Sequence, residues 1–177
     1  MRILLIGDSI TEGFNTSLLL PEYDIINKGV YGDNTDGVLK RLGKDVMDEM
    51  PDIVSVLIGT NDFALEKTDD QIIENIEKII VSLKETVTGI IICSILPVSN
   101  IINRPNERIN SVNSRIEKLA LKHNIKYWNI HKFFVNSRGS IQREYTKDGL
   151  HLSDMGYALW AKMFREYFFG LISNKLV

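Results

Sequence analysis

Short apolar runs and longer amphipathic stretches alternate along the chain. The near-continuous apolar runs are typical of strands buried on both faces, and they predict strands near residues 2–7, 24–28, 52–58, 89–95 and 125–130. Apolar residues at helical spacing predict helices between them, near residues 35–49, 69–86, 105–123 and 154–170. Strands that alternate with helices favour a parallel sheet with right-handed crossovers and helices on both faces.

Local signals mark the beginnings of two of these helices. Thr68 and Gln71 have the spacing of a capping box, and Ser153 is placed to cap the last helix. One stripe of the last helix is largely aromatic and is expected to face the core: Tyr157, Trp160, Ala161, Phe164 and Phe168. We therefore expect a single α/β domain over residues 1–177, with three α/β/α layers and a five-stranded parallel sheet in the flavodoxin-like order 2-1-3-4-5.

Composition agrees with one enzyme domain and disfavours several other classes. Hydrophobic residues make up 44% of the 177 residues, enough for a sizeable core. The net charge of -2, from 21 basic and 23 acidic residues, gives no reason to expect nucleic acid or an anionic membrane surface as a partner. The single cysteine, Cys93, lies in an apolar run and is expected to be a buried structural thiol. No Cys/His cluster has zinc spacing, so we expect no metal.

The sequence contains no pattern typical of export or membrane insertion. The first apolar run is too short for a signal peptide and lacks a small-residue cleavage site. No stretch approaches the roughly 20 apolar residues of a membrane span. We therefore expect a cytoplasmic protein, and the sequence leaves its oligomeric state open.

A polar turn directly follows the first predicted strand. Gly7, Asp8 and Ser9 lie at the strand's carboxyl end, which is the edge where open α/β sheets bind ligands. A serine there, near the N-terminus of the next helix, can act as a nucleophile on which backbone N–H groups converge. The alternative is that Asp8 and Ser9 only form a turn and cap the helix.

A serine nucleophile needs a base, and the chain has three histidines. Only His151 has a carboxylate, that of Asp148, at short spacing within a turn. His123 lies at a charged helix end, where a solvated or dipole-stabilised histidine is expected, and His131 follows a strand, where it can serve as a cap. Asp148 and His151 are therefore the candidate orienting acid and base.

Two further polar turns follow the second and third predicted strands. Gly32 can present a backbone N–H with no side chain in the way, and Asn61 can aim a side-chain N–H donor at the same point. Both are also compatible with ordinary turns.

Taken in order, these four blocks resemble the defining blocks of the SGNH hydrolases, also called the GDSL esterase/lipase family. The blocks are Gly7-Asp8-Ser9, Gly32, Gly59-Thr60-Asn61-Asp62 and Asp148-Gly149-Leu150-His151. They span most of the chain, and the one departure in the first block is Ile10, where the family name implies leucine. The resemblance implies the same three-layer fold and strand order.

The resemblance also implies a carboxylic ester hydrolase that works through an acyl-enzyme and needs no cofactor. Ser9 would attack the ester carbonyl, His151 would transfer the proton, and Asp148 would hold the imidazole. The N–H of Ser9, the N–H of Gly32 and the side-chain amide of Asn61 would form the oxyanion hole. The α/β-hydrolases share the order Ser…Asp…His, but they need a Gly-x-Ser-x-Gly elbow that the turn at Ser9 lacks.

Residues beside the four blocks are expected to support the site or to line a substrate pocket. They are Asp8, Ile10, Tyr31, Asp33, Asn34, Phe63 and Leu150. Residues 96–105, after the fourth strand, are long enough to act as a wall or a lid, and Arg104 there either meets an anionic substrate group or is a surface arginine. The compact chain favours small-molecule esters with short acyl groups, among them acetyl groups on carbohydrates.

Other functions stay open at this stage. Lysophospholipase or thioesterase activity and acyl transfer would use the same residues. A non-catalytic binding module on this fold is disfavoured because every chemical position holds a competent residue. A phosphotransfer domain with Asp8 or Asp62 as acceptor is disfavoured because position 10 is Ile, where a haloacid-dehalogenase-type phosphatase has Asp.

Overall fold

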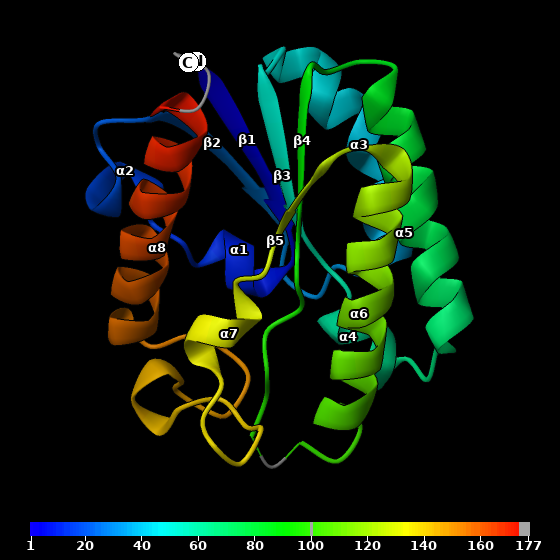
Figure 1. The fold of residues 1–177 in the computed structure, drawn as a ribbon, viewed down its shortest axis with the longest axis vertical. Coiled ribbons are helices and arrows are strands. Elements are labelled where there is room, and N and C mark those ends of the chain that lie inside the picture. The colour runs from blue at the N-terminus through cyan, green and yellow to red at the C-terminus, as the bar shows by residue number, and fades with distance from the viewer. Residues whose placement is uncertain (100, 174–177) are drawn as a thin grey trace.

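The computed structural model describes residues 1–99 and 101–173, which contain one parallel five-stranded sheet between two helical layers (Figure 1). The strands are β1 (Arg2–Gly7), β2 (Asp24–Gly29), β3 (Ile53–Leu57), β4 (Gly89–Cys93) and β5 (Lys126–Trp128). Their order in the sheet is β2-β1-β3-β4-β5, which confirms the predicted order.

The helices cover both faces of the sheet. The long helices are α3 (Thr35–Glu49), α5 (Asp69–Lys84), α6 (Asn106–His123) and α8 (Asp154–Ser173). The short ones are α1 (Ser9–Glu12), α2 (Thr16–Leu19), α4 (Thr60–Ala64), α7 (His131–Phe134) and the 3₁₀ turn η1 (Arg143–Tyr145). Figure 1 shows α3, α5 and α6 on one side of the sheet, and α8 with α1, α2 and α7 on the other.

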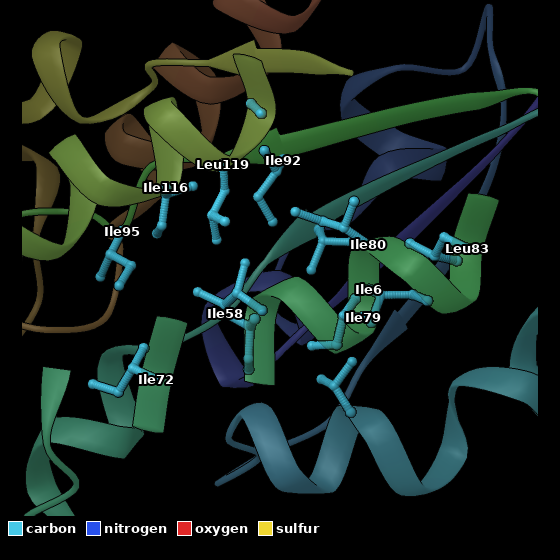
Figure 2. Close-up of a cluster of buried hydrophobic side chains, with 14 of the residues drawn as sticks. Ile6, Ile58, Ile72, Ile79, Ile80, Leu83, Ile92, Ile95, Ile116 and Leu119 are labelled. Carbon is cyan, nitrogen blue, oxygen red and sulfur yellow. The ribbon is translucent and has the colours of Figure 1, made fainter. Parts of the chain in front are cut away.

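Apolar side chains alternate between these two sides along the central strands. In β1, Leu4 and Ile6 belong to the core beneath α3, α5 and α6, whereas Ile3 and Leu5 belong to the core beneath α8. The first core is rich in isoleucine, and Figure 2 shows its side chains converging between the sheet and α5 and α6. Because both faces are covered, the central strands β1, β3 and β4 are apolar at nearly every position.

The element boundaries differ from the sequence prediction mainly where ladder pairing stops. β4 ends at Cys93 rather than at residue 95, because the N–H of Ile95 donates to the side chain of Asn113 instead of to a strand (2.7 Å). Likewise β5 covers three residues rather than the predicted 125–130. The helices α2, α4 and α7 and the turn η1 lie outside the predicted elements, since three to five residues are too few to show a helical period.

Two predicted helix caps are present. Thr68 and Gln71 form a reciprocal capping box at the start of α5. At the start of α8, the hydroxyl of Ser153 accepts a hydrogen bond from the N–H of Gly156 (3.1 Å). These bonds satisfy N–H groups that the helices themselves leave free, and so fix where the helices begin.

Candidate active site

The polar turns identified in the sequence lie at one edge of the sheet. Gly7, at the end of β1, is level in register with Gly29, at the end of β2. Ser9, Gly32 and Asn61 each follow the end of β1, β2 or β3 by a few residues. Because these three strands are parallel neighbours, their carboxyl ends bring the three residues to the same place.

The turn that carries Ser9 is tightly packed. A Cβ atom on Gly7 would lie 2.1 Å from the hydroxyl oxygen of Thr11, so no larger residue fits without displacement. Asp8 caps α1, with its carboxylate accepting a hydrogen bond from the N–H of Ile10 (2.9 Å). Ser9 is the first residue of α1 and is half-buried. The turn and cap expected at this position are therefore present, and they hold the serine at the sheet edge.

The imidazole of His151 lies between Ser9 and Asp148. Its Nε2 is 3.1 Å from the hydroxyl oxygen of Ser9, and its Nδ1 is 2.7 Å from Oδ2 of Asp148. The three residues come from opposite ends of the chain, 142 positions apart between the serine and the histidine. A hydroxyl, an imidazole and a carboxylate in this sequence of contacts can pass a proton from the serine to the histidine.

The loop before α8 supplies hydrogen bonds that stabilise the ionised carboxylate of Asp148. Its Oδ1 accepts hydrogen bonds from the N–H groups of Leu150 and His151, at 2.9 and 2.8 Å. Burial opposes ionisation, but the hydrogen bonds from the His151 ring and from these two amides prevail and lower the pKa of Asp148 to about 2. Gly149 has φ +91°, and a Cβ there would lie 2.3 Å from the carbonyl oxygen of Ser99, so both conformation and space require glycine.

Gly32 and Asn61 occupy the turns beside Ser9. Gly32 has φ +72°, a conformation that favours glycine, and it is exposed. Asn61 is the second residue of α4 and donates from Nδ2 to the carbonyl oxygen of Asp33, the residue after Gly32 (2.8 Å). This bond ties the turn after β2 to the turn after β3, the two strands that flank β1 in the sheet.

The remaining predicted residues divide into structural supports and exposed neighbours. The carboxylate of Asp33 pairs with Arg41 (2.8 Å), and the side chain of Asn34 caps α3. Ile10 and Phe63 are buried at 3% and 1% exposure, so they pack behind the turns and do not line a substrate pocket. Of the two others, Tyr31 is exposed and Leu150 is half-buried between the two cores.

Two polar side chains that support the Ser9 turn carry no signal in the sequence. Asn27 of β2 donates to the carbonyl oxygen of Thr11 (2.6 Å), and the hydroxyl of Tyr157 on α8 donates to the carbonyl oxygen of Ile10 (2.9 Å). Tyr157 is 147 positions from its partner and looks like one more member of the aromatic core stripe. Only the fold brings such residues together.

The other histidines and the cysteine make contacts away from Ser9. His131 is buried, its Nδ1 lies 2.9 Å from the carbonyl oxygen of Ile95, and burial lowers its pKa. His123 contacts Glu77 (2.8 Å) instead of being solvated. Cys93 is buried as expected, and burial raises the pKa of its thiol to about 12.

Asp8 is a carboxylic acid inside the core of the site. It is 1% exposed, and burial, the largest effect, raises its pKa to about 7. The hydrogen bond from Ile10 and the charge of His151 favour the ionised form, whereas the charges of Asp33 and Asp62 oppose it. Between the ordinary carboxyl value of 3.8 and about 7, the folded protein therefore holds a proton that the unfolded chain has released.

Replacement of Asp8 by asparagine is expected to stabilise the protein above pH 7. The folded-state pKa is raised, so the stability of the natural protein falls as pH rises from about 4 to about 7. The variant keeps an oxygen for the Ile10 N–H and loses this penalty, a gain of a few kcal/mol since each pKa unit is worth ~1.4 kcal/mol. Urea unfolding at pH 5 and pH 8 measures it. Asp8→Ala is the control, because it also removes the charge but loses the cap, at a cost of ~1 kcal/mol. Equal pH slopes for Asp8→Asn and the natural protein would contradict the prediction.

Residues 1–99 and 101–173, which the structure describes, contain neither a metal-binding cluster nor a membrane-spanning helix. Within these ranges, no three His, Cys, Asp or Glu side chains are grouped so that they could hold a metal ion. None of the helices there combines the length and the apolar character needed to cross a bilayer.

Known proteins resemble this chain over most of its length. Residues 5–159 match the GDSL-like Lipase/Acylhydrolase family. Platelet-activating factor acetylhydrolase IB subunit alpha1 from Homo sapiens is 28% identical over 164 residues, which cover 88% of this chain and 70% of the human protein.

Solved structures are similar over nearly the whole chain. A Streptococcus pneumonia protein, provisionally described as a platelet activating factor, is 32% identical with a TM-score of 0.88, covering 94% of this chain and 83% of that one. The lipase/acylhydrolase from Enterococcus faecalis is 27% identical with a TM-score of 0.82, covering 96% of both chains. The chain therefore belongs to the GDSL-like lipase/acylhydrolase family, has the SGNH hydrolase fold and is a carboxylic ester hydrolase.

Proposed function

We propose that the protein is a serine esterase that works through an acyl-enzyme, with Ser9, His151 and Asp148 as its catalytic triad. The observation that carries the proposal is the pair of contacts made by one imidazole, 3.1 Å to the Ser9 hydroxyl and 2.7 Å to the Asp148 carboxylate. The hydroxyl oxygen of Ser9 attacks the ester carbonyl, and Nε2 of His151 takes its proton. Asp148, whose pKa is about 2, stays ionised and stabilises the imidazolium.

In the remaining steps His151 acts in turn as an acid, as a base and again as an acid. The imidazolium of His151 gives its proton to the leaving alcohol, and a carboxylic ester remains on Ser9. His151 then removes a proton from water as the water oxygen attacks the acyl-enzyme, and it returns this proton to the Ser9 oxygen as the carboxylic acid leaves. The negative oxygen of each tetrahedral intermediate is bound by the N–H of Ser9, the N–H of Gly32 and the side-chain amide of Asn61.

The proposed substrates are small-molecule esters with short acyl groups, acetyl above all, and acetylated carbohydrates are a candidate class. The triad is open to solvent, since the side chains of His151 and Asp148 are 33% and 52% exposed. Ile10 and Phe63, the apolar side chains next to the polar turns, are packed in the core and offer no acyl channel. The human relative is named an acetylhydrolase, which also favours a short acyl group.

A panel of esters graded by acyl length tests the substrate class. We expect kcat/KM on 4-nitrophenyl esters to be highest for acetyl and to fall by about 10-fold or more by the octanoyl ester. One methylene in a fitted pocket changes binding by only ~1–3 kcal/mol. A long acyl chain that has no fitted pocket loses this contribution at every additional methylene. Acetylated sugars, a lysophospholipid and an acyl thioester complete the panel. Preference for the lysophospholipid or the thioester would support those activities instead, and no turnover of any ester would support a binding module.

A further inference from the structure

The segment after β4 contacts both halves of the site. The N–H of Ser99 donates to the carbonyl oxygen of Gly149, in the loop of the catalytic acid and base (2.8 Å). Val98 exchanges two hydrogen bonds with the side chain of Asn106 on α6, at 2.9 and 2.8 Å. The stretch 96–99 is thus tied to its surroundings as a wall, and the other end of the segment brings Arg104 to α4.

Two guanidinium nitrogens of Arg104 donate hydrogen bonds to the first two residues of α4. Its Nε donates to the carbonyl oxygen of Thr60 (3.0 Å), and one terminal nitrogen donates to Oδ1 of Asn61 (3.1 Å). The other terminal nitrogen donates to the side chain of Asn103 (3.2 Å). The guanidinium is half-buried, and its burial lowers the pKa of Arg104, an effect that the carboxylate of Asp8 opposes.

These contacts fix which way the Asn61 amide points. A guanidinium can only donate, so it holds the amide oxygen, and the carbonyl oxygen of Asp33 can only accept, so it holds the amide nitrogen. One N–H of the amide group is used by Asp33, and the second is left for a developing oxyanion. A cation on the amide oxygen also draws charge toward itself and strengthens the N–H groups as donors.

We infer that Arg104 is a positioning residue of the oxyanion hole, which holds and polarises the Asn61 amide; the inference rests on the proposed function of this site. Arg104 acts through Asn61 and not by contact with the substrate. It matters most in the transition state, when the negative charge forms, so its loss lowers kcat and leaves KM nearly unchanged. The competing role for Arg104 is recognition of an anionic substrate group, which would change KM for charged esters only.

The test combines Arg104→Ala, Asn61→Ala and the double variant, with kcat and KM measured on neutral 4-nitrophenyl acetate and on the negatively charged hemisuccinate ester. Removal of one oxyanion donor costs roughly 10²–10³-fold. We expect Asn61→Ala to lose that much in kcat, and Arg104→Ala to lose about 10–100-fold on both esters. The double variant should be no slower than Asn61→Ala, because the arginine acts only through the asparagine.

Two more variants separate this role from a general loss of structure. Arg104→Lys keeps the charge but not the planar guanidinium that donates to two acceptors at once, so it should recover only part of the lost kcat. Arg115→Ala removes an arginine of α6 whose ion pair is with Asp70 on α5 (2.7 Å), and it should keep natural activity. Thermal unfolding of each variant checks that it is folded.

The outcomes distinguish the inference from the proposed function. If Asn61→Ala is slow and Arg104→Ala keeps its kcat, the inference alone is wrong. A rise in KM confined to the hemisuccinate ester would assign Arg104 to an anionic subsite. If the kcat loss of the double variant equals the product of the losses of the two single variants, Arg104 acts independently of Asn61. If Asn61→Ala keeps natural kcat, the proposed oxyanion hole is wrong and the inference falls with it.

Discussion

Replacement of Ser9 by alanine is expected to lower ester turnover by about 10⁶-fold while the protein stays folded, as large as the loss when a triad serine is removed elsewhere. The hydroxyl oxygen is the atom that attacks the carbonyl, and His151 has no other serine within reach in the described contacts. The change removes one half-buried hydroxyl at the start of α1, and the cap by Asp8 remains, so stability should change little. Turnover of 4-nitrophenyl acetate and labelling by a fluorophosphonate probe measure the loss.

The matched control for this prediction is Ser114→Ala. Ser114 is exposed on α6, and its hydroxyl donates only to the carbonyl oxygen of Asn110 one turn earlier (3.1 Å). This variant should label and turn over like the natural protein. Near-natural turnover by purified Ser9→Ala, with contaminating esterases excluded, would remove the basis of the proposed function.

Replacement of Asp148 by asparagine is expected to slow the reaction at its optimum by up to about 10⁴-fold, because the imidazole loses the partner that sets its tautomer and orientation. The pH profile should change as well. Asp148 has a pKa of about 2 and stays ionised wherever the enzyme works, so its negative charge faces the His151 ring, 2.7 Å away, over the whole working range. Without the carboxylate the imidazolium is less stable, and the acid limb of kcat/KM should therefore move to lower pH.

Rate and pH profile are measured together for Asp148→Asn, His151→Ala and a control, Asp70→Asn. Asp70 is an exposed carboxylate that pairs with Arg115, and its replacement should change neither quantity. His151→Ala should be at least as slow as Asp148→Asn, since a backbone carbonyl can take over part of the aspartate's work but nothing replaces the base. If both triad variants kept the natural rate and profile, the base would have to be sought at His131, which follows the carboxyl end of β5.

The sequence by itself determined the order of elements and which residues are candidates for the chemistry. The apolar runs of the strands are a local pattern, because in a sheet that is covered on both faces each strand residue is buried on one face or the other. The alternation of Leu4 and Ile6 with Ile3 and Leu5 between the two cores follows from that requirement. The capping box at Thr68 and the glycine-containing turns after the strands are also local, so composition and spacing suffice to find them.

Only the tertiary structure decided which neighbours of the motif residues reach the site. Ile10 and Phe63 adjoin it in sequence, but packing turns their side chains into the two cores, and Asp33 is held by Arg41. Arg104 and Tyr157 support the Asn61 and Ser9 turns from 43 and 147 positions away. The physical reason is that spacing along a chain reports contacts within one element, whereas the partner of a buried polar group is chosen among distant segments that packing brings within hydrogen-bond distance.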